Sequence, residues 1–115
     1  MKKSVKLTIL IIALLFIGSL MAILIKKQPV QILFYSDSCP HCKIVEQYIK
    51  DNNVKNYLVF DELEVSANPA NAQLLVKEAA SCGLPTEGLV VPFFFDGTNC
   101  FVGDQEIIKY FESKK

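Results

Sequence analysis

Apolar and charged residues divide this chain into two parts. Residues 7–25 run for 19 positions without a charge, roughly 28 Å as a helix and close to the hydrocarbon thickness of a bilayer. Lysines flank this run on both sides: Lys2, Lys3 and Lys6 before it, Lys26 and Lys27 after it. The pattern predicts an N-terminal tail and transmembrane anchor over residues 1–27 and a folded domain over residues 28–115.

A cleaved signal peptide and a buried soluble helix are the alternatives to an anchor. The apolar run is longer than the apolar region of most signal peptides, and Leu20-Met21-Ala22 is a poor cleavage site. A soluble helix that is apolar on all sides would need a large protein around it. We therefore expect an uncleaved signal-anchor that makes this a single-pass protein of the cell membrane. The greater number of lysines before the run favours an extracytoplasmic domain.

The rest of the chain alternates between short apolar runs and amphipathic stripes. The runs predict strands over residues 30–35, 57–60, 90–95 and 100–102, with a hairpin turn over residues 96–99. Helices are predicted after Cys39, from Asn68-Pro69 to about Gly83, and from Gly103-Asp104 onward. The predicted order is β-α-β-α-β-β-α.

Charge excludes one class of partner. Residues 30–115 carry 7 Lys against 12 Asp and Glu, and the chain has no Arg. An acidic domain of this kind is a poor candidate for binding nucleic acid or anionic lipid headgroups.

Cys39-Pro40-His41-Cys42 is the segment with the most distinctive chemistry, because it follows directly on a predicted strand. Residues three apart share one face of a helix, so the two sulfurs can form a small disulfide ring. A cysteine at a helix N-terminus has a lowered pKa. A thiolate beside a second thiol is sufficient for thiol–disulfide exchange.

With these elements in order, residues 30–113 resemble the thioredoxin fold in its short, glutaredoxin-like form, an α/β domain of three layers. The resemblance rests on the CXXC segment after the first strand, on Val91-Pro92 and on the Asp96-Gly97 hairpin that leads to Gly103-Asp104. It implies that Cys39 is the attacking nucleophile and that Cys42 resolves the mixed disulfide. It also implies a cis-proline at Pro92 and substrate binding by Val91, Pro92 and Tyr35.

Pro40 and His41 are the predicted tuning residues. The Pro-His pair resembles that of periplasmic dithiol oxidases, in which an imidazole near the thiolate would make the disulfide more oxidising. The same tetrapeptide also occurs in glutaredoxin-like reductases, so the direction of electron flow stays open. The glutathione-binding marks of the family are incomplete, since Asp37 stands where a basic residue is usual and Val102-Gly103 replaces a glycine pair. We expect no cofactor and leave glutathione open.

Cys82 and Cys100 form a second pair across the chain. In an oxidising compartment an even cysteine count favours a structural disulfide between them. Two buried, inert thiols and a relay pair that passes electrons to the first pair are the alternatives.

Taken together, these features predict a membrane-anchored thiol–disulfide oxidoreductase that acts on protein or small thiols and is recycled by a membrane redox partner. The alternative is a non-enzymatic module that binds or handles zinc or copper through Cys39, Cys42 and His41. Zinc usually takes four ligands, and no second close Cys/His pair follows in the sequence. We therefore predict no metal site. A third hypothesis is a redox-inert adaptor that keeps the fold for protein contacts.

Overall fold

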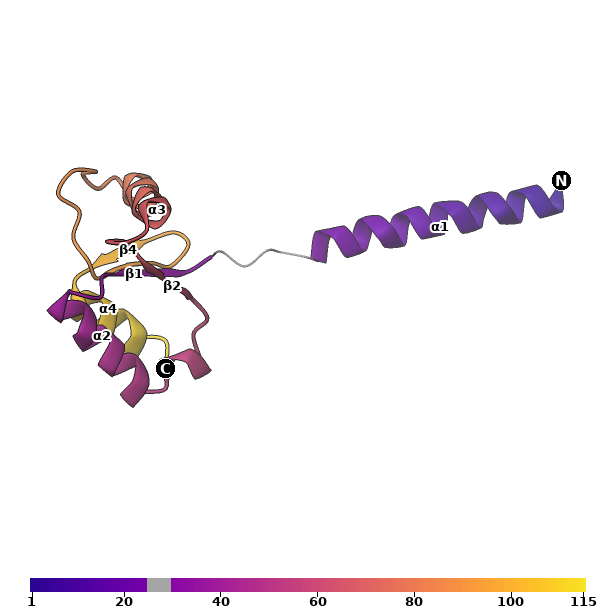
Figure 1. Cartoon of the computed structure of the whole chain (residues 1–115). Coiled ribbons are helices and arrows are strands. Elements are labelled where there is room, and N and C mark those ends of the chain that lie inside the picture. The colour runs from indigo at the N-terminus through magenta and orange to yellow at the C-terminus, as the bar shows by residue number, and fades with distance from the viewer. Residues whose placement is uncertain (25–29) are drawn as a thin grey trace.

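The computed structural model describes residues 1–24 and 30–115 (Figure 1). Helix α1 (Lys2–Leu24) is N-terminal and apolar, and its segment Lys2–Leu20 has a mean hydropathy of 2.0 and no buried residues. By length and composition α1 can cross a membrane, which is also true of a signal sequence. Ile25, Lys26 and Lys27, with the predicted boundary between anchor and domain, lie outside the described residues.

The domain is built on a mixed sheet of four strands in the order β2-β1-β3-β4. Strand β1 (Ile32–Tyr35) is parallel to β2 (Asp61–Glu64) and antiparallel to β3 (Phe93–Phe95), which pairs with β4 (Cys100–Val102). The helices are α2 (Pro40–Asp51), the 3-10 turn η1 (Val54–Asn56), α3 (Pro69–Ser81) and α4 (Asp104–Glu112). This order and topology are thioredoxin-like and confirm the predicted fold class.

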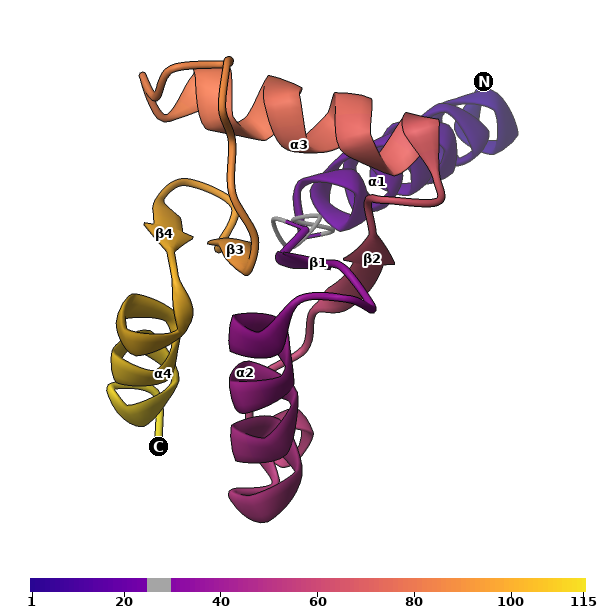
Figure 2. The ribbon, with the colours of Figure 1, turned by 60° about the vertical axis from the view of Figure 1, so that its left-hand side comes forward.

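Helices cover both faces of the sheet, with α2 and α4 on one side and α3 on the other (Figures 1 and 2). Alternation along the strands explains the three layers, because successive side chains point to opposite faces. Leu33 and Phe94 join the cluster beneath α2 and α4, whereas Phe34 and Phe93 join the cluster beneath α3. The central strands are therefore apolar on both faces.

The predicted second strand is misplaced, since β2 covers Asp61–Glu64 rather than residues 57–60. Tyr57 and Leu58 instead close the turn at η1, where their N–H groups donate to Val54 O, and Leu58 is buried in the core. Pairing with β1 begins only at Asp61, whose N–H donates to Gln31 O. An edge strand exposes much of its surface, so this acidic segment forms a strand without an apolar run.

The first and third strands also begin later than predicted, at Ile32 and Phe93. Pro92 precedes β3 with a cis peptide bond to Val91, and proline has no N–H to contribute to a sheet. The predicted helix from Asn68-Pro69 is confirmed, because Asn68 Oδ1 accepts hydrogen bonds from the N–H groups of Ala70 and Asn71.

Candidate active site

Cys39 is the N-cap residue of α2, in an extended conformation just before the helix. Its Sγ accepts a hydrogen bond from the N–H of Cys42 at 3.1 Å. The sulfur therefore occupies the place of a capping oxygen, where free amide groups and the helix dipole favour a negative charge. This is the environment that a reactive thiolate needs.

Cys42 lies one helical turn further on and has a different environment. Its side chain is 5% exposed and both cysteines are free thiols. Burial, together with the side-chain hydrogen bond to Cys39, raises the pKa of Cys42 to about 12. Cys42 consequently keeps its proton at neutral pH, while Cys39 is only half-buried and receives an amide hydrogen bond.

The segment before β3 lies against the first thiol. The Cys39 thiol donates to Val91 O at 3.5 Å, and the peptide bond between Val91 and Pro92 is cis. The N–H of Gly103 donates to Pro92 O at 2.9 Å, which holds the start of α4 to the same place. Gly103 has a φ of +90°, a conformation that favours glycine. Three segments far apart in the sequence thus meet at Cys39.

His41 and Asp104 join α2 to α4 at this meeting point. The imidazole is exposed, and its Nδ1 lies 3.3 Å from Asp104 Oδ1. The carboxylate is placed to pair with the imidazolium when His41 is protonated. The sequence placed Asp104 at the start of the last helix but did not indicate this contact, which depends on how α2 packs against α4.

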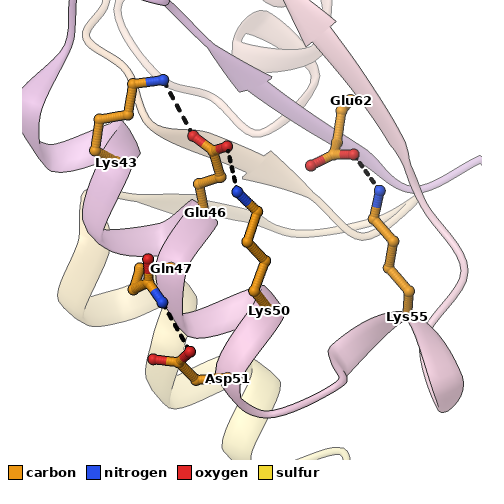
Figure 3. A network of polar contacts seen from close by, with 7 residues as sticks. All are labelled: Lys43, Glu46, Gln47, Lys50, Asp51, Lys55 and Glu62. Atoms are coloured by element: carbon orange, nitrogen blue, oxygen red, sulfur yellow. Dashed lines mark hydrogen bonds and ion pairs between the residues drawn. The ribbon is translucent and has the colours of Figure 1, made fainter.

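A small cavity reaches Cys42 from the side of the sheet next to α2. Its volume is about 120 Å³, and it is lined by Tyr35, Ser36, Asp37, Cys42, Lys43 and Glu46, together with Leu33. Tyr35, predicted to contact substrate, therefore lies beside the buried thiol, and burial raises the pKa of its hydroxyl. Glu46 accepts from Lys43 at 3.1 Å and from Lys50 at 3.0 Å (Figure 3). Neither Lys43 nor Glu46 was predicted from the sequence to lie near the site.

Cys82 and Cys100 are joined by a disulfide with a Cα–Cα distance of 6.1 Å. Cys82 is the C-cap of α3 and Cys100 is the first residue of β4. Cys100 pairs with Phe95, at the end of the β3–β4 hairpin that is away from Pro92. The disulfide therefore links the α3 layer to the edge of the sheet at a distance from the free thiols.

The part of the chain that the structure describes holds no group of three or more His, Cys, Asp or Glu side chains placed for a metal ion. A search for known protein families finds no model that matches this chain, and no curated protein matches it. Its function is therefore inferred from a thioredoxin-like fold with a CXXC pair at the start of α2.

Proposed function

We propose that this protein is a membrane-anchored thiol–disulfide oxidoreductase that exchanges disulfides with protein or small thiols through Cys39 and Cys42. The observation that carries the proposal is the asymmetry of the pair. Cys39 Sγ receives an amide hydrogen bond at the N-terminus of α2, whereas Cys42 is buried one turn away and holds its proton. Cys39 is thus the proposed nucleophile, and Cys42 is the resolving thiol that stays protonated until the mixed disulfide has formed.

In the reductive direction the Cys39 thiolate attacks one sulfur of a substrate disulfide. A Cys39–substrate disulfide forms, and the other substrate sulfur leaves as a thiolate that takes a proton from water. Cys42 then loses its proton and attacks Cys39 Sγ, which forms the Cys39–Cys42 disulfide and releases the second substrate thiolate. Oxidation of a substrate dithiol is the same sequence reversed, and the electrons reside on sulfur throughout.

Two features of the site assist these steps. The positive charge of Lys43 acts to lower the pKa of Cys42, and the cavity beside Cys42 gives water a route to its proton. Val91 lies next to Cys39, so an extended substrate segment that reaches the reactive sulfur passes along its backbone. We assign Val91 and Pro92 to substrate positioning, in agreement with the family resemblance.

The proposed location is the extracytoplasmic face of the cell membrane. Helix α1 can serve as an anchor, and the Cys82–Cys100 disulfide fits an oxidising compartment. A membrane redox partner that recycles the Cys39–Cys42 pair completes the proposal.

Turnover of insulin disulfides by the full chain in detergent tests the activity. Cys39→Ser should abolish turnover, because it removes the attacking sulfur. Cys42→Ser should accumulate a stable mixed disulfide between Cys39 and substrate. The double variant Cys82→Ser/Cys100→Ser is the control and should keep turnover. Full activity in the Cys39→Ser variant would refute the assignment.

A further inference from the structure

The two ends of the parallel strands differ in chemistry. Strands β1 and β2 run in the same direction, with Ile32 paired to Asp61 and Tyr35 paired to Glu64. Cys39 follows the C-terminal end of β1, so the active site lies at that end of the sheet. The residues that precede β1 and β2 lie at the opposite end.

An apolar groove occupies this opposite end. It has a volume of about 530 Å³ and is lined mainly by Val30, Tyr57, Leu58, Val59 and Phe60. Val59 is 88% exposed, more than any other large apolar side chain of the described domain, and Val30 is 50% exposed. The two exposed valines come from segments that meet at one groove, so this end of the domain presents apolar side chains to its surroundings.

The number of residues between α1 and the groove limits the distance between them. Helix α1 ends at Leu24, and six peptide steps lead to Val30 in the groove wall. Fully extended, six residues span at most about 20 Å. A domain tethered to a membrane helix by so short a segment keeps its groove within that distance of the end of the helix.

We propose that the groove face, defined as Val30, Tyr57, Val59 and Phe60, rests on the bilayer that holds α1 and so directs Cys39 away from the membrane. This inference rests on the anchoring role of α1 in the proposed function. Aliphatic and aromatic side chains at the headgroup boundary bury apolar surface at a depth of about 5–10 Å. Cys39 then meets protein or small thiols and disulfides in the aqueous phase, and a membrane redox partner would have to reach it with a part that lies outside the bilayer.

Charge indicates which lipid surface this face accepts. Asp61 also lines the groove, and Lys55, at its margin, pairs with Glu62 and lies over the Phe60 ring. The acidic domain gains no attraction from anionic headgroups. Zwitterionic phosphatidylcholine is therefore the appropriate probe surface.

The absence of tryptophan from the chain permits a direct test. Val59→Trp places one fluorophore on the groove face, and Val90→Trp places one at the active-site end, where Val90 is 58% exposed beside Val91. Each full-length variant is reconstituted in phosphatidylcholine vesicles with brominated acyl chains, which quench tryptophan at short range. We expect loss of fluorescence for V59W and none for V90W, relative to vesicles without bromine.

Flotation of the vesicles and insulin turnover, measured on the same samples, separate the possible failures. Protein that floats with the vesicles but shows no quenching of V59W, or stronger quenching of V90W, overturns the docking. Protein that does not float overturns the anchoring and the docking together. If the wild-type chain shows no insulin turnover while the fluorescence of V59W is still quenched, the redox function is overturned and the docking remains supported.

Discussion

At the scale of single residues, two cysteines three positions apart acquire different chemistry from their surroundings. Cys39 stands before the first turn of α2 and receives an N–H hydrogen bond, while Cys42 lies inside the helix against the sheet. Desolvation penalises the charged form of a thiol and amide hydrogen bonds favour it. The position of each sulfur relative to the helix start therefore assigns the proposed roles.

Alkylation of the reduced protein by iodoacetamide should follow this asymmetry. Near neutral pH we expect modification of Cys39 and protection of Cys42, whose rate should rise about tenfold per pH unit as the pH approaches its pKa of about 12. Mass spectrometry of the labelled peptides measures both rates, and the urea-unfolded chain is the control in which Cys42 reacts. Equal labelling of both thiols in the folded chain would contradict the prediction.

The same shift has a consequence for stability. Because folding raises the pKa of Cys42 from 9.0 to about 12, the protonated thiol favours the folded, reduced state below about pH 9. This contribution is lost as the pH rises from 9 toward 12. The Cys42→Ala variant should lack that part of the pH dependence of the free energy of unfolding.

His41 should raise the reduction potential of the Cys39–Cys42 pair. An imidazolium near a thiolate stabilises the reduced form, so His41→Ala should lower the potential by about 30 mV, a tenfold change in equilibrium constant. Asp104→Asn should lower it by less, because Asp104 acts only through the exposed His41. Equilibration with glutathione redox buffers measures the potential. Lys50→Gln, at the far end of α2, is the control, and an unchanged potential in His41→Ala would contradict the role.

At the scale of elements, the Cys82–Cys100 disulfide ties the end of α3 to the start of β4. Strand β4 is a short edge strand of three residues, and α3 lies on the face of the sheet opposite to α2 and α4. A cross-link between them shortens the loop that the unfolded chain can explore. We therefore expect the disulfide to act on stability rather than on the chemistry at Cys39.

Cys82→Ser/Cys100→Ser should reduce the free energy of unfolding by about 3 kcal/mol, the size expected for a closed loop of this length. Denaturant titration of the full chain in detergent, followed by circular dichroism, measures the change. Cys39→Ser/Cys42→Ser is the matched control with the second disulfide intact. A double variant as stable as the wild type would show that the cross-link contributes nothing to the fold.

At the scale of the whole molecule, an apolar helix and a thioredoxin-like domain with a CXXC pair are joined by a short segment. An uncleaved α1 would confine the domain to the region near the membrane surface, and the side of the membrane then decides whether the compartment favours oxidation or reduction. The proposed extracytoplasmic location therefore depends on α1 and its orientation in the membrane and cannot be derived from the CXXC site alone.

Thiol trapping in intact cells tests location and redox state together. After a mild reductant, we expect a membrane-impermeant alkylating reagent to label Cys39 of the full chain, because the domain faces outward. Permeabilised cells provide the control for total thiol. Labelling only after permeabilisation would place the domain in the cytoplasm, and recovery of a shortened chain without α1 would identify a cleaved signal peptide.

Local rules allowed much of this protein to be predicted from its sequence. The CXXC segment at the start of a helix, the Asn68 N-cap and the Asp96–Asn99 turn each depend on a few neighbouring residues. Hydrophobic patterning was sufficient for the order of elements and the apolar α1. It failed at β2, because an acidic edge strand owes its place to pairing with β1 rather than to its own composition.

Apart from the Cys82–Cys100 disulfide, which the even cysteine count favoured, the tertiary structure decided the contacts between distant segments. The approach of Val91 O to Cys39, the pairing of His41 with Asp104 and the apolar groove opposite the active site are of this kind. The sequence by itself determined that a CXXC pair begins a helix in a domain with the thioredoxin-like order of elements. Only the packing of helices and strands decided which side chains surround that dithiol and which face of the domain lies nearest the tether, because such contacts join residues that no local pattern relates.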